Sequence, residues 1–240
     1  MTRLRPATPA DLPALTEVQR AYDAAFFGEP EHDLDEVREW LDLGDVTCVV
    51  EDGAAIVGAA IKHRTGSAAL VGPATDRAAV AARLVSWLAE VGAPNTEALE
   101  RDEALRDALA AAGWRHDYSS FELFRAVGGG WQRPAAQWPD GVRVRRLAPG
   151  QEDALHTLIY AAAGWADVRG HYYRDRDEWA RLFLTGRTPD ERPVLAWRGD
   201  RPVGAVLVRL FSDRTGWIAQ LAVARSERGR GLGRALLLEG

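Results

Sequence analysis

The chain has 240 residues, of which 47% are hydrophobic and 27% are charged, and its formal net charge is −5 at pH 7. These values are typical of a globular protein with one large or two small domains, and the negative charge argues against nucleic acid as a general partner. No apolar run reaches the roughly 18 residues that a membrane span needs, and residues 1–6 lack the apolar core of a signal peptide. We therefore expect a cytoplasmic protein that has no membrane partner.

Cys48 is the only cysteine of the chain. An internal disulfide and a multi-cysteine metal site are therefore excluded, and we expect no bound metal. The flanking residues Val46, Thr47, Val49 and Val50 favour a strand residue over a nucleophile at this position.

The first half of the chain has an alternating series of strand and helix signals. Val80, Leu84, Trp87 and Leu88, for example, fall at helical spacing. The signals predict strands at 2–6, 45–51, 55–62, 68–72, 94–98 and 115–125, and helices at 9–24, 34–42, 76–91 and 102–112.

An acidic cluster precedes the helix predicted at 34–42. We interpret it as a solvated helix start with Asp33 or Asp35 as the N-cap, because it lacks the pattern of three ligands on one helix face that would suggest zinc. The alternative is that it lines a groove between two domains and contributes to a substrate pocket. Its members are Glu29, Glu31, His32, Asp33, Asp35 and Glu36.

The two halves of the chain resemble each other in sequence. Residues 3–15 align without a gap with residues 143–155, and residues 49–59 align with residues 195–205. In both copies a short strand is followed by a proline that suits a first helical turn, and a later pair of strands surrounds a polar turn. The alternative is chance similarity between two α/β domains.

The repeat predicts two tandem domains. We expect the first at residues 1–127 and the second at residues 142–240. The segment between them, residues 128–141, contains several of the glycines and prolines that break regular structure, and we expect it to be a linker.

The second copy ends in an apolar strand, a glycine-rich turn and a leucine-rich helix. The strand runs from Trp217 to Val223, and the turn reads Arg228-Gly229-Arg230-Gly231-Leu232-Gly233. Glycines let backbone N–H groups approach a phosphate closely, and the amino end of a helix favours negative charge. A Walker loop would need Lys-Ser or Lys-Thr at the helix start, and a Rossmann loop would need an acidic residue about 20 residues on, so neither pattern fits. A plain basic turn is the remaining alternative.

The pattern Arg-x-x-Gly-x-Gly after a Leu-Ala-Val strand resembles the acetyl-CoA pyrophosphate loop of the GCN5-related N-acetyltransferases (GNAT). The resemblance implies a mixed-sheet α/β fold with two tandem acyl-CoA N-acyltransferase domains, in a layout similar to that of mycothiol synthase. It implies acetyl-CoA as co-substrate and a small primary amine as acceptor. The implied cofactor-binding residues are Leu221, Ala222, Val223, Arg228, Gly229, Arg230, Gly231, Leu232, Gly233 and Arg234.

The first copy lacks the glycine-rich turn. At the matching place it has Pro73, which removes an N–H donor, and Asp76, which puts a negative charge at the helix start. We therefore expect residues 1–127 to bind no anionic cofactor. The resemblance also implies a further strand, helix and strand after the last helix of the second copy, so we expect the second domain to be truncated.

The resemblance also implies where the acceptor binds. Several members of that family carry a glutamate on the strand before the loop as general base, where this chain has Ala219 and Gln220. We expect the proton carrier to be His171, whose ordinary pKa of about 6.5 suits neutral pH. The same segment, residues 164–179, is expected to form the acceptor wall; the alternative is a solvated helix face with packed aromatic residues. The expected acceptor-binding residues are Trp165, Asp167, Tyr172 and Asp175.

Two other classes of function stay open at this point. A non-catalytic protein that binds CoA, or that associates with proteins through its paired domains, would show the same loop without an identified base. A nucleotide or nucleic-acid binder that uses Arg228 and Arg230 has weaker support. Self-association into a homo-oligomer is also left open.

Overall fold

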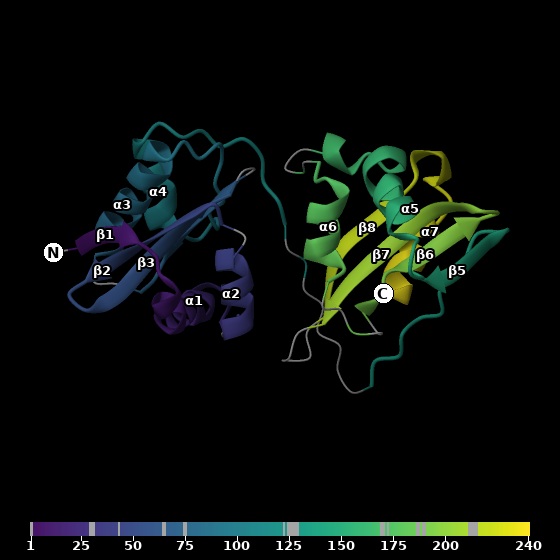
Figure 1. The fold of residues 1–240 in the computed structure, drawn as a ribbon, viewed down its shortest axis with the longest axis horizontal. Helices are drawn as coiled ribbons and strands as arrows, with labels where there is room; N and C mark the ends of the chain where they lie inside the picture. Colours follow the sequence, from purple (N-terminus) through teal and green to yellow (C-terminus); the bar gives the residue numbers. More distant parts are fainter. Residues whose placement is uncertain are drawn as a thin grey trace. The chain divides into compact units, whose positions relative to one another are not determined.

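The computed structural model describes residues 2–28, 32–42, 44–63, 66–73, 76–121, 123, 130–168, 171, 173–185, 188, 191–210 and 216–240. The chain divides into two compact units, Met1–Asp117 (unit 1) and Tyr118–Gly240 (unit 2). Each unit contains one four-stranded sheet with helices packed against it (Figure 1). Among the described residues, no helix combines the length and the apolar character that crossing a bilayer requires.

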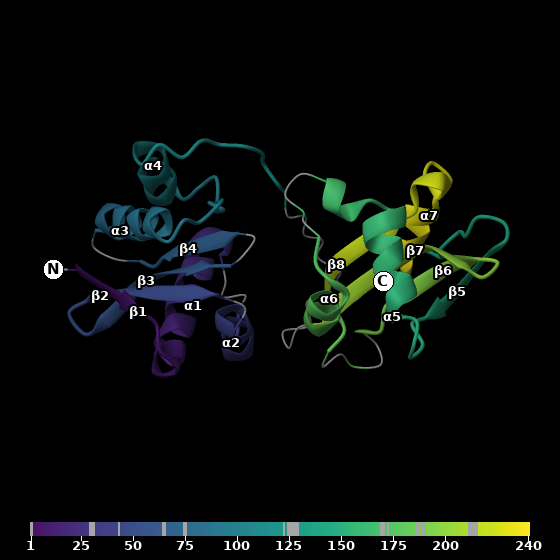
Figure 2. The ribbon, with the colours of Figure 1, turned by 45° about the horizontal axis from the view of Figure 1, so that its top comes forward.

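Unit 1 is an antiparallel sheet in the order β1-β2-β3-β4 between two pairs of helices. Figure 2 shows α1 and α2 on one face of the sheet and α3 and α4 on the other. Buried residues of α1 and α2 meet Val49 and Ala59 of the sheet, and those of α3 and α4 meet Cys48, Val50 and Ala60. The elements are β1 (Thr2–Pro6), α1 (Leu12–Phe27), α2 (Leu34–Asp42), β2 (Val46–Asp52), β3 (Ala55–Lys62), β4 (Ser67–Val71), α3 (Arg77–Glu90) and α4 (Glu103–Ala111).

Two predicted strands of unit 1 do not form as expected. The strand predicted at 94–98 is reduced to an isolated bridge between Ala68 and Glu97. The strand predicted at 115–125 is wrong over residues 115–121 and 123, where the chain is irregular. Phe121 and Leu123 are 86% and 92% exposed. An apolar pattern indicates a strand only where a sheet edge is available to pair with it, and the pattern itself carries no information about that edge.

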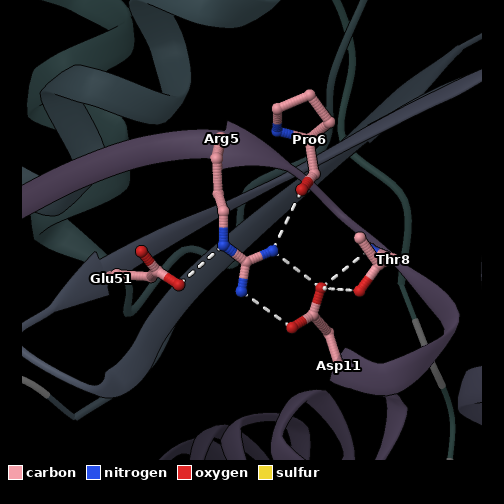
Figure 3. Close-up of polar contacts among 5 residues, drawn as sticks. All are labelled: Arg5, Pro6, Thr8, Asp11 and Glu51. Carbon is pink, nitrogen blue, oxygen red and sulfur yellow. Dashed lines mark hydrogen bonds and ion pairs between the residues drawn. The ribbon is translucent and has the colours of Figure 1, made fainter.

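The start of unit 1 is held by an ionic cluster around Arg5 (Figure 3). The Arg5 guanidinium donates two hydrogen bonds of 2.8 Å to the Asp11 carboxylate and one of 2.6 Å to Glu51. The same carboxylate accepts from the backbone N–H of Thr8 at 2.7 Å. The hydrogen bonds from Arg5 lower the pKa of Asp11. The Arg5 guanidinium thus joins β1, β2 and the turn that begins α1.

Two smaller predictions for unit 1 are confirmed. Cys48 lies in β2 and is 1% exposed, and burial raises the pKa of its thiol to about 12. Asp33 caps α2, because its side chain accepts from the backbone N–H groups of Asp35 and Glu36 at 2.9 and 3.0 Å. Glu29 and Glu31 of the acidic cluster lie outside the described residues.

Unit 2 repeats this arrangement with an antiparallel sheet in the order β5-β6-β7-β8. Helix α7 covers one face of the sheet, and α5, η2 and α6 cover the other. The turn η2 is a π-helical continuation of α5. The elements are β5 (Val142–Arg146), α5 (Glu152–Thr157), η2 (Leu158–Ala162), η3 (Trp165–Asp167), α6 (Arg176–Phe183), β6 (Val194–Arg198), β7 (Arg201–Leu210), β8 (Gly216–Val223), η5 (Arg225–Glu227) and α7 (Leu232–Glu239).

The two units share a bulge at the aligned position. Val57 is the extra residue in the β2–β3 pairing, and Val203 is the extra residue in the β6–β7 pairing. The glycine that follows each bulge lies under a helix. A Cβ on Gly58 would come within 2.7 Å of Val80 in α3, and a Cβ on Gly204 would come within 2.7 Å of Leu236 in α7. The sequence repeat therefore corresponds to a repeat of backbone geometry and helix packing.

The boundary between the units falls between Asp117 and Tyr118, ahead of the predicted linker. Residues 124–129, which include the predicted domain boundary, lie outside the described residues. The described part of the linker, residues 130–141, has no helix or strand.

Candidate functional site

The glycine-rich turn forms a loop between β8 and α7. Gly229 and Gly231 both have left-handed backbones, with φ of +76° and +82°, a conformation that costs residues with a Cβ atom. A Cβ atom at either position would meet no other atom within 4 Å. The surface of the loop is therefore open above both glycines.

The loop presents the amino end of α7. Gly231 is its N-cap and provides no capping side chain. The N–H of Ala235 donates to Gly231 O at 3.0 Å, so the amides of Gly231, Leu232, Gly233 and Arg234 come before the first helical hydrogen bond. Such amides and the positive end of the helix dipole favour an anion.

Arg228 ties the loop to the rest of unit 2. Its guanidinium donates to Ala163 O at 2.7 Å through Nη2 and to Val223 O at 3.3 Å through Nε. Ala163 is the residue that ends the π-helical turn η2. Arg228 therefore positions the loop, and two of its five N–H donors are bonded to backbone carbonyls of the same unit.

A buried carboxylate lies directly before the loop. Glu227 is 5% exposed, and it accepts from Arg198 at 3.1 and 3.2 Å and from Arg230 at 3.3 Å. Arg201 lies 3.5 Å away. These contacts, first among them the hydrogen bonds from Arg198, lower the pKa of Glu227. Sequence reasoning missed Glu227, because the hairpin that supplies two of its partners lies 29 residues earlier at Arg198.

Strand β8 carries the residues expected to contact the thioester. Leu221, Ala222 and Val223 pair with Val206, Ala205 and Gly204 of β7. Leu221 and Val223 pack on the side of α7, and Ala222 faces α5 and α6. Among the described residues, β8 has β7 as its only strand partner.

A bulge in β8 lies directly beside Gln220. Leu207 pairs with Gln220 and Val208 pairs with Ile218, so Ala219 is the extra residue. Gln220 is 2% exposed and accepts a 3.0 Å hydrogen bond from the indole N–H of Trp179 in α6. Its amide is therefore held by the protein and cannot take up a proton at neutral pH.

The expected acceptor wall begins with a stacked pair of rings. Trp165 and His171 lie with centroids 4.3 Å apart and planes tilted by 28°. The backbone N–H of His171 donates to Val168 O at 2.9 Å. Burial lowers the pKa of His171, and the positive charge of Arg174 lowers it further. The imidazole is therefore neutral at pH 7.

A second arginine, Arg225 of η5, connects the expected acceptor wall to the segment just before the loop. The Arg225 guanidinium pairs with the Asp167 carboxylate. Gly164 has a left-handed backbone with φ of +69°, and a Cβ there would overlap the Arg225 guanidinium. Arg225 and Arg228 thus bind the two ends of the segment 163–167. The carboxylate of Asp167, an expected acceptor residue, is therefore already paired with the Arg225 guanidinium.

The other two expected acceptor residues are Asp175 and Tyr172. The Asp175 side chain caps α6 by accepting from the backbone N–H groups of Asp177 and Glu178 at 3.1 and 2.9 Å. Tyr172 lies outside the described residues.

A cluster of three rings, His156, Tyr160 and Tyr173, was not expected from the sequence. The rings of His156 and Tyr160 lie with centroids 4.7 Å apart and planes tilted by 47°, and both rings contact Tyr173. Nε2 of His156 lies 2.9 Å from Arg174 O. The Tyr160 hydroxyl is buried and makes no hydrogen bond among the described residues. The spacing of four residues between His156 and Tyr160 was the available signal, since it puts both on one helix face. An open hollow of about 490 Å³ is lined by Asp153, His156, Thr157, Tyr173 and Arg176.

At the matching place in unit 1, the side chains of Asp76 and Arg77 are bonded to the protein itself. Asp76 caps α3 by accepting from the N–H of Ala79 at 3.0 Å. Arg77 donates to Gly72 O at 3.0 Å and to the buried carboxylate of Asp102 at 2.9 Å. Pro73 is described, but the two residues after it are not. In neither unit do the described residues include three or more His, Cys, Asp or Glu side chains placed to hold a metal.

The loop, β8 and the helices around them lie in a segment that matches a known family. Residues 154–239 match the model of the acetyltransferase (GNAT) family. No curated protein sequence matches the chain.

Solved structures with the same fold cover the whole chain. A GCN5-related N-acetyltransferase from Sphaerobacter thermophilus is 24% identical, with a TM-score of 0.75 over 99% of this chain and 81% of its own. A tandem GNAT protein from the clavulanic acid biosynthesis pathway is 18% identical, with a TM-score of 0.63 over 100% and 84%. A glucosamine N-acetyltransferase region of a fungal multi-domain β-N-acetylglucosaminidase is 15% identical, with a TM-score of 0.61 over 100% and 33%. The predicted fold class, a mixed α/β protein with two GNAT-like units, is confirmed.

Proposed function

We propose that unit 2 is an N-acyltransferase of the GNAT type that transfers an acetyl group from acetyl-CoA to a primary amine of a small molecule. The observation that carries the proposal is the loop between β8 and α7, within the segment that matches the GNAT family model. Its glycines leave the loop surface open, and the amides of Gly231–Arg234 form the amino end of a helix. A pyrophosphate suits both features. The further cofactor contacts that we propose are the main chain of Leu221–Val223 and the loop residues Arg228–Arg230.

Bound acetyl-CoA would supply the acetyl group as an activated thioester. The residues of the chain then have three tasks: to hold the pyrophosphate, to orient the carbonyl and to remove a proton from the amine. We assign the first to the loop amides and the second to the main chain of β8, because a backbone N–H aimed at a carbonyl oxygen stabilises the developing negative charge. We assign the third to His171, whose lowered pKa keeps it unprotonated at neutral pH.

We further propose that the acceptor amine binds at the Trp165–His171 pair. Aromatic faces attract cations such as ammonium groups, and the Asp167 carboxylate, which pairs with Arg225, lies in the same short helix η3 as Trp165. Asp175 has a smaller part in this proposal, because one of its oxygens already caps α6.

In the same proposal the first domain binds no acyl-CoA. At the place that corresponds to the loop, Asp76 already accepts from an amide at the start of α3, and its charge would repel a phosphate. The proposed division of labour is a cofactor-free domain at residues 1–127 and a working domain at residues 142–240, with the linker 128–141 between them.

A second candidate function is a CoA-binding protein without catalysis. Gln220 favours it, because an amide stands where a carboxylate base is found in several relatives and its oxygen is already bonded to Trp179. Such a protein would bind CoA and would release no thiol.

The test is thiol release from acetyl-CoA by the full chain across a panel of primary amines, beside calorimetry with CoA. We expect CoA binding and release of free thiol with at least one amine. Gly231→Asp should abolish both, since it adds a side chain and a negative charge at the phosphate position. Binding without thiol release would favour the second candidate, and an absence of CoA binding would refute both.

A further inference from the structure

Three arginines converge on one buried carboxylate beside the loop. The Glu227 oxygens lie 3.1 Å from Nη2 of Arg198, 3.3 Å from Nη1 of Arg230 and 3.5 Å from Nη2 of Arg201. One negative charge faces three positive charges, so positive charge is in excess here although the chain as a whole has a net charge of −5. We call Glu227, Arg198, Arg201 and Arg230 the arginine cluster.

The members of the arginine cluster differ in what they can still bind. Arg198 makes two hydrogen bonds to Glu227 and a third, of 2.7 Å, to Asp140 O, and its side chain is 33% exposed. Arg201 and Arg230 each reach Glu227 through one terminal nitrogen, and their side chains are 64% and 59% exposed. A guanidinium has five N–H donors. Arg201 and Arg230 therefore keep most of their donors for another anion.

The fold explains why Arg201 and Arg230 lie together. Arg201 is the first residue of β7, and Arg230 lies in the loop that follows β8. The pairing of Gly204 with Val223 sets the start of β7 beside the end of β8, as the adjacent arrows of Figure 1 show. Both guanidinium groups then contact the same carboxylate, which holds two like charges side by side.

The ligand of the proposed function carries a second anionic group at a suitable place. In CoA, the ribose that is linked to the pyrophosphate also bears a 3′-phosphate, only a few covalent bonds away. A pyrophosphate on the amides of Gly231–Arg234 would therefore keep the 3′-phosphate close to Arg230. Arginine suits this group, since its planar fork can form two parallel hydrogen bonds to a phosphate.

We propose that Arg201 and Arg230, held by Glu227, form a subsite for the 3′-phosphate of CoA and thereby distinguish CoA from dephospho-CoA. The proposal rests on the proposed function of unit 2. Glu227 acts in it as a positioning residue: its buried carboxylate offsets the repulsion between the guanidinium groups and fixes their place beside the loop.

The experiment compares CoA with dephospho-CoA by calorimetry on the full chain. For the unmodified protein we expect CoA to bind about tenfold more tightly, as expected for one exposed charge-assisted contact to a phosphate. Arg201→Gln should reduce this ratio to about threefold or less and leave the affinity for dephospho-CoA unchanged. Arg201 lies outside the phosphate loop, so this variant tests the subsite separately from the pyrophosphate contacts.

Arg181→Gln is the matched control, because Arg181 is an exposed arginine of α6, which packs on the face of the sheet opposite α7. It should leave the ratio unchanged. The melting temperatures of both variants check that they fold. If the unmodified protein binds CoA and dephospho-CoA with equal affinity, the subsite is refuted and the proposed function stands. The same conclusion follows if Arg201→Gln weakens the binding of both ligands equally. If neither ligand binds the unmodified protein, the proposed function and the subsite both fail.

Discussion

Replacing Gly231 by alanine separates the part that the loop plays in folding from the part that it plays in binding. Gly231 has φ of +82° and ψ of −3°, and a left-handed backbone costs a residue with a Cβ about 1–2 kcal/mol. The added methyl group meets no atom within 4 Å, so no steric overlap adds to this cost. We expect the free energy of unfolding of unit 2 to fall by about 1–2 kcal/mol.

The effect on CoA binding should be larger than the effect on folding. The methyl group would stand where a phosphate approaches the amides at the start of α7, and a hydrogen bond to a charged group contributes about 1.5–3 kcal/mol. Losing one such bond weakens binding by at least about tenfold. Calorimetry with CoA measures this loss, and urea denaturation measures the stability.

Gly150→Ala is the matched control within the same unit. Gly150 has φ of +83°, and a Cβ there also meets no atom within 4 Å, but it precedes α5 and lies outside the loop. We expect the same loss of stability and an unchanged affinity for CoA. If the Gly231 and Gly150 variants bind CoA equally well, the loop is not the phosphate site. If Gly231→Ala costs no stability, the left-handed geometry is wrong.

Three further predictions concern charge and stoichiometry. Arg5 lowers the pKa of Asp11, so the ionised carboxylate stabilises the fold above the ordinary aspartate pKa of about 3.9, and this stability is lost as the pH falls through the lowered pKa. Asp11→Asn should therefore cost about 1–3 kcal/mol at pH 7 and much less at pH 2, as measured by urea denaturation; equal costs at both pH values would contradict the argument. The lowered pKa of His171 should place the acid limb of kcat/KM below pH 6.5, and His171→Gln should remove that limb; an unchanged profile would assign the base elsewhere. Because Asp76 caps α3, calorimetry should give one CoA per chain and none in Gly231→Asp, whereas two per chain would refute the assignment of unit 1.

Predictions from the sequence succeeded where the signal was local. Apolar spacing predicted a helix at 76–91, and α3 runs from Arg77 to Glu90. The hairpin signal predicted a strand at 55–62, which is the extent of β3. The strand predicted at 115–125 was wrong over its described residues because a strand needs a partner edge, and that edge belongs to another part of the chain.

In the candidate site, too, the local features could be predicted and the contacts between distant residues could not. The glycine spacing was enough to predict a loop at the start of a helix, because left-handed turns and helix starts depend on neighbouring residues. The ion-pair and hydrogen-bond partners of the acceptor-wall residues could not be predicted. The sequence had no signal that Arg225 pairs with Asp167. It also had no signal that one carboxylate oxygen of Asp175 accepts the hydrogen bonds that cap α6.

By itself the sequence determined elements such as α3 and β3 and the loop that opens α7, since each of these depends on residues close to one another in the chain. Only the tertiary structure decided which distant groups meet. Trp179 and Gln220 are 41 residues apart in the chain, and Arg228 and Ala163 are 65 apart. The register of β7 and β8 and the packing of α5 and α6 bring these groups together, because a polar group that folding removes from water needs a hydrogen-bond partner wherever in the chain that partner lies.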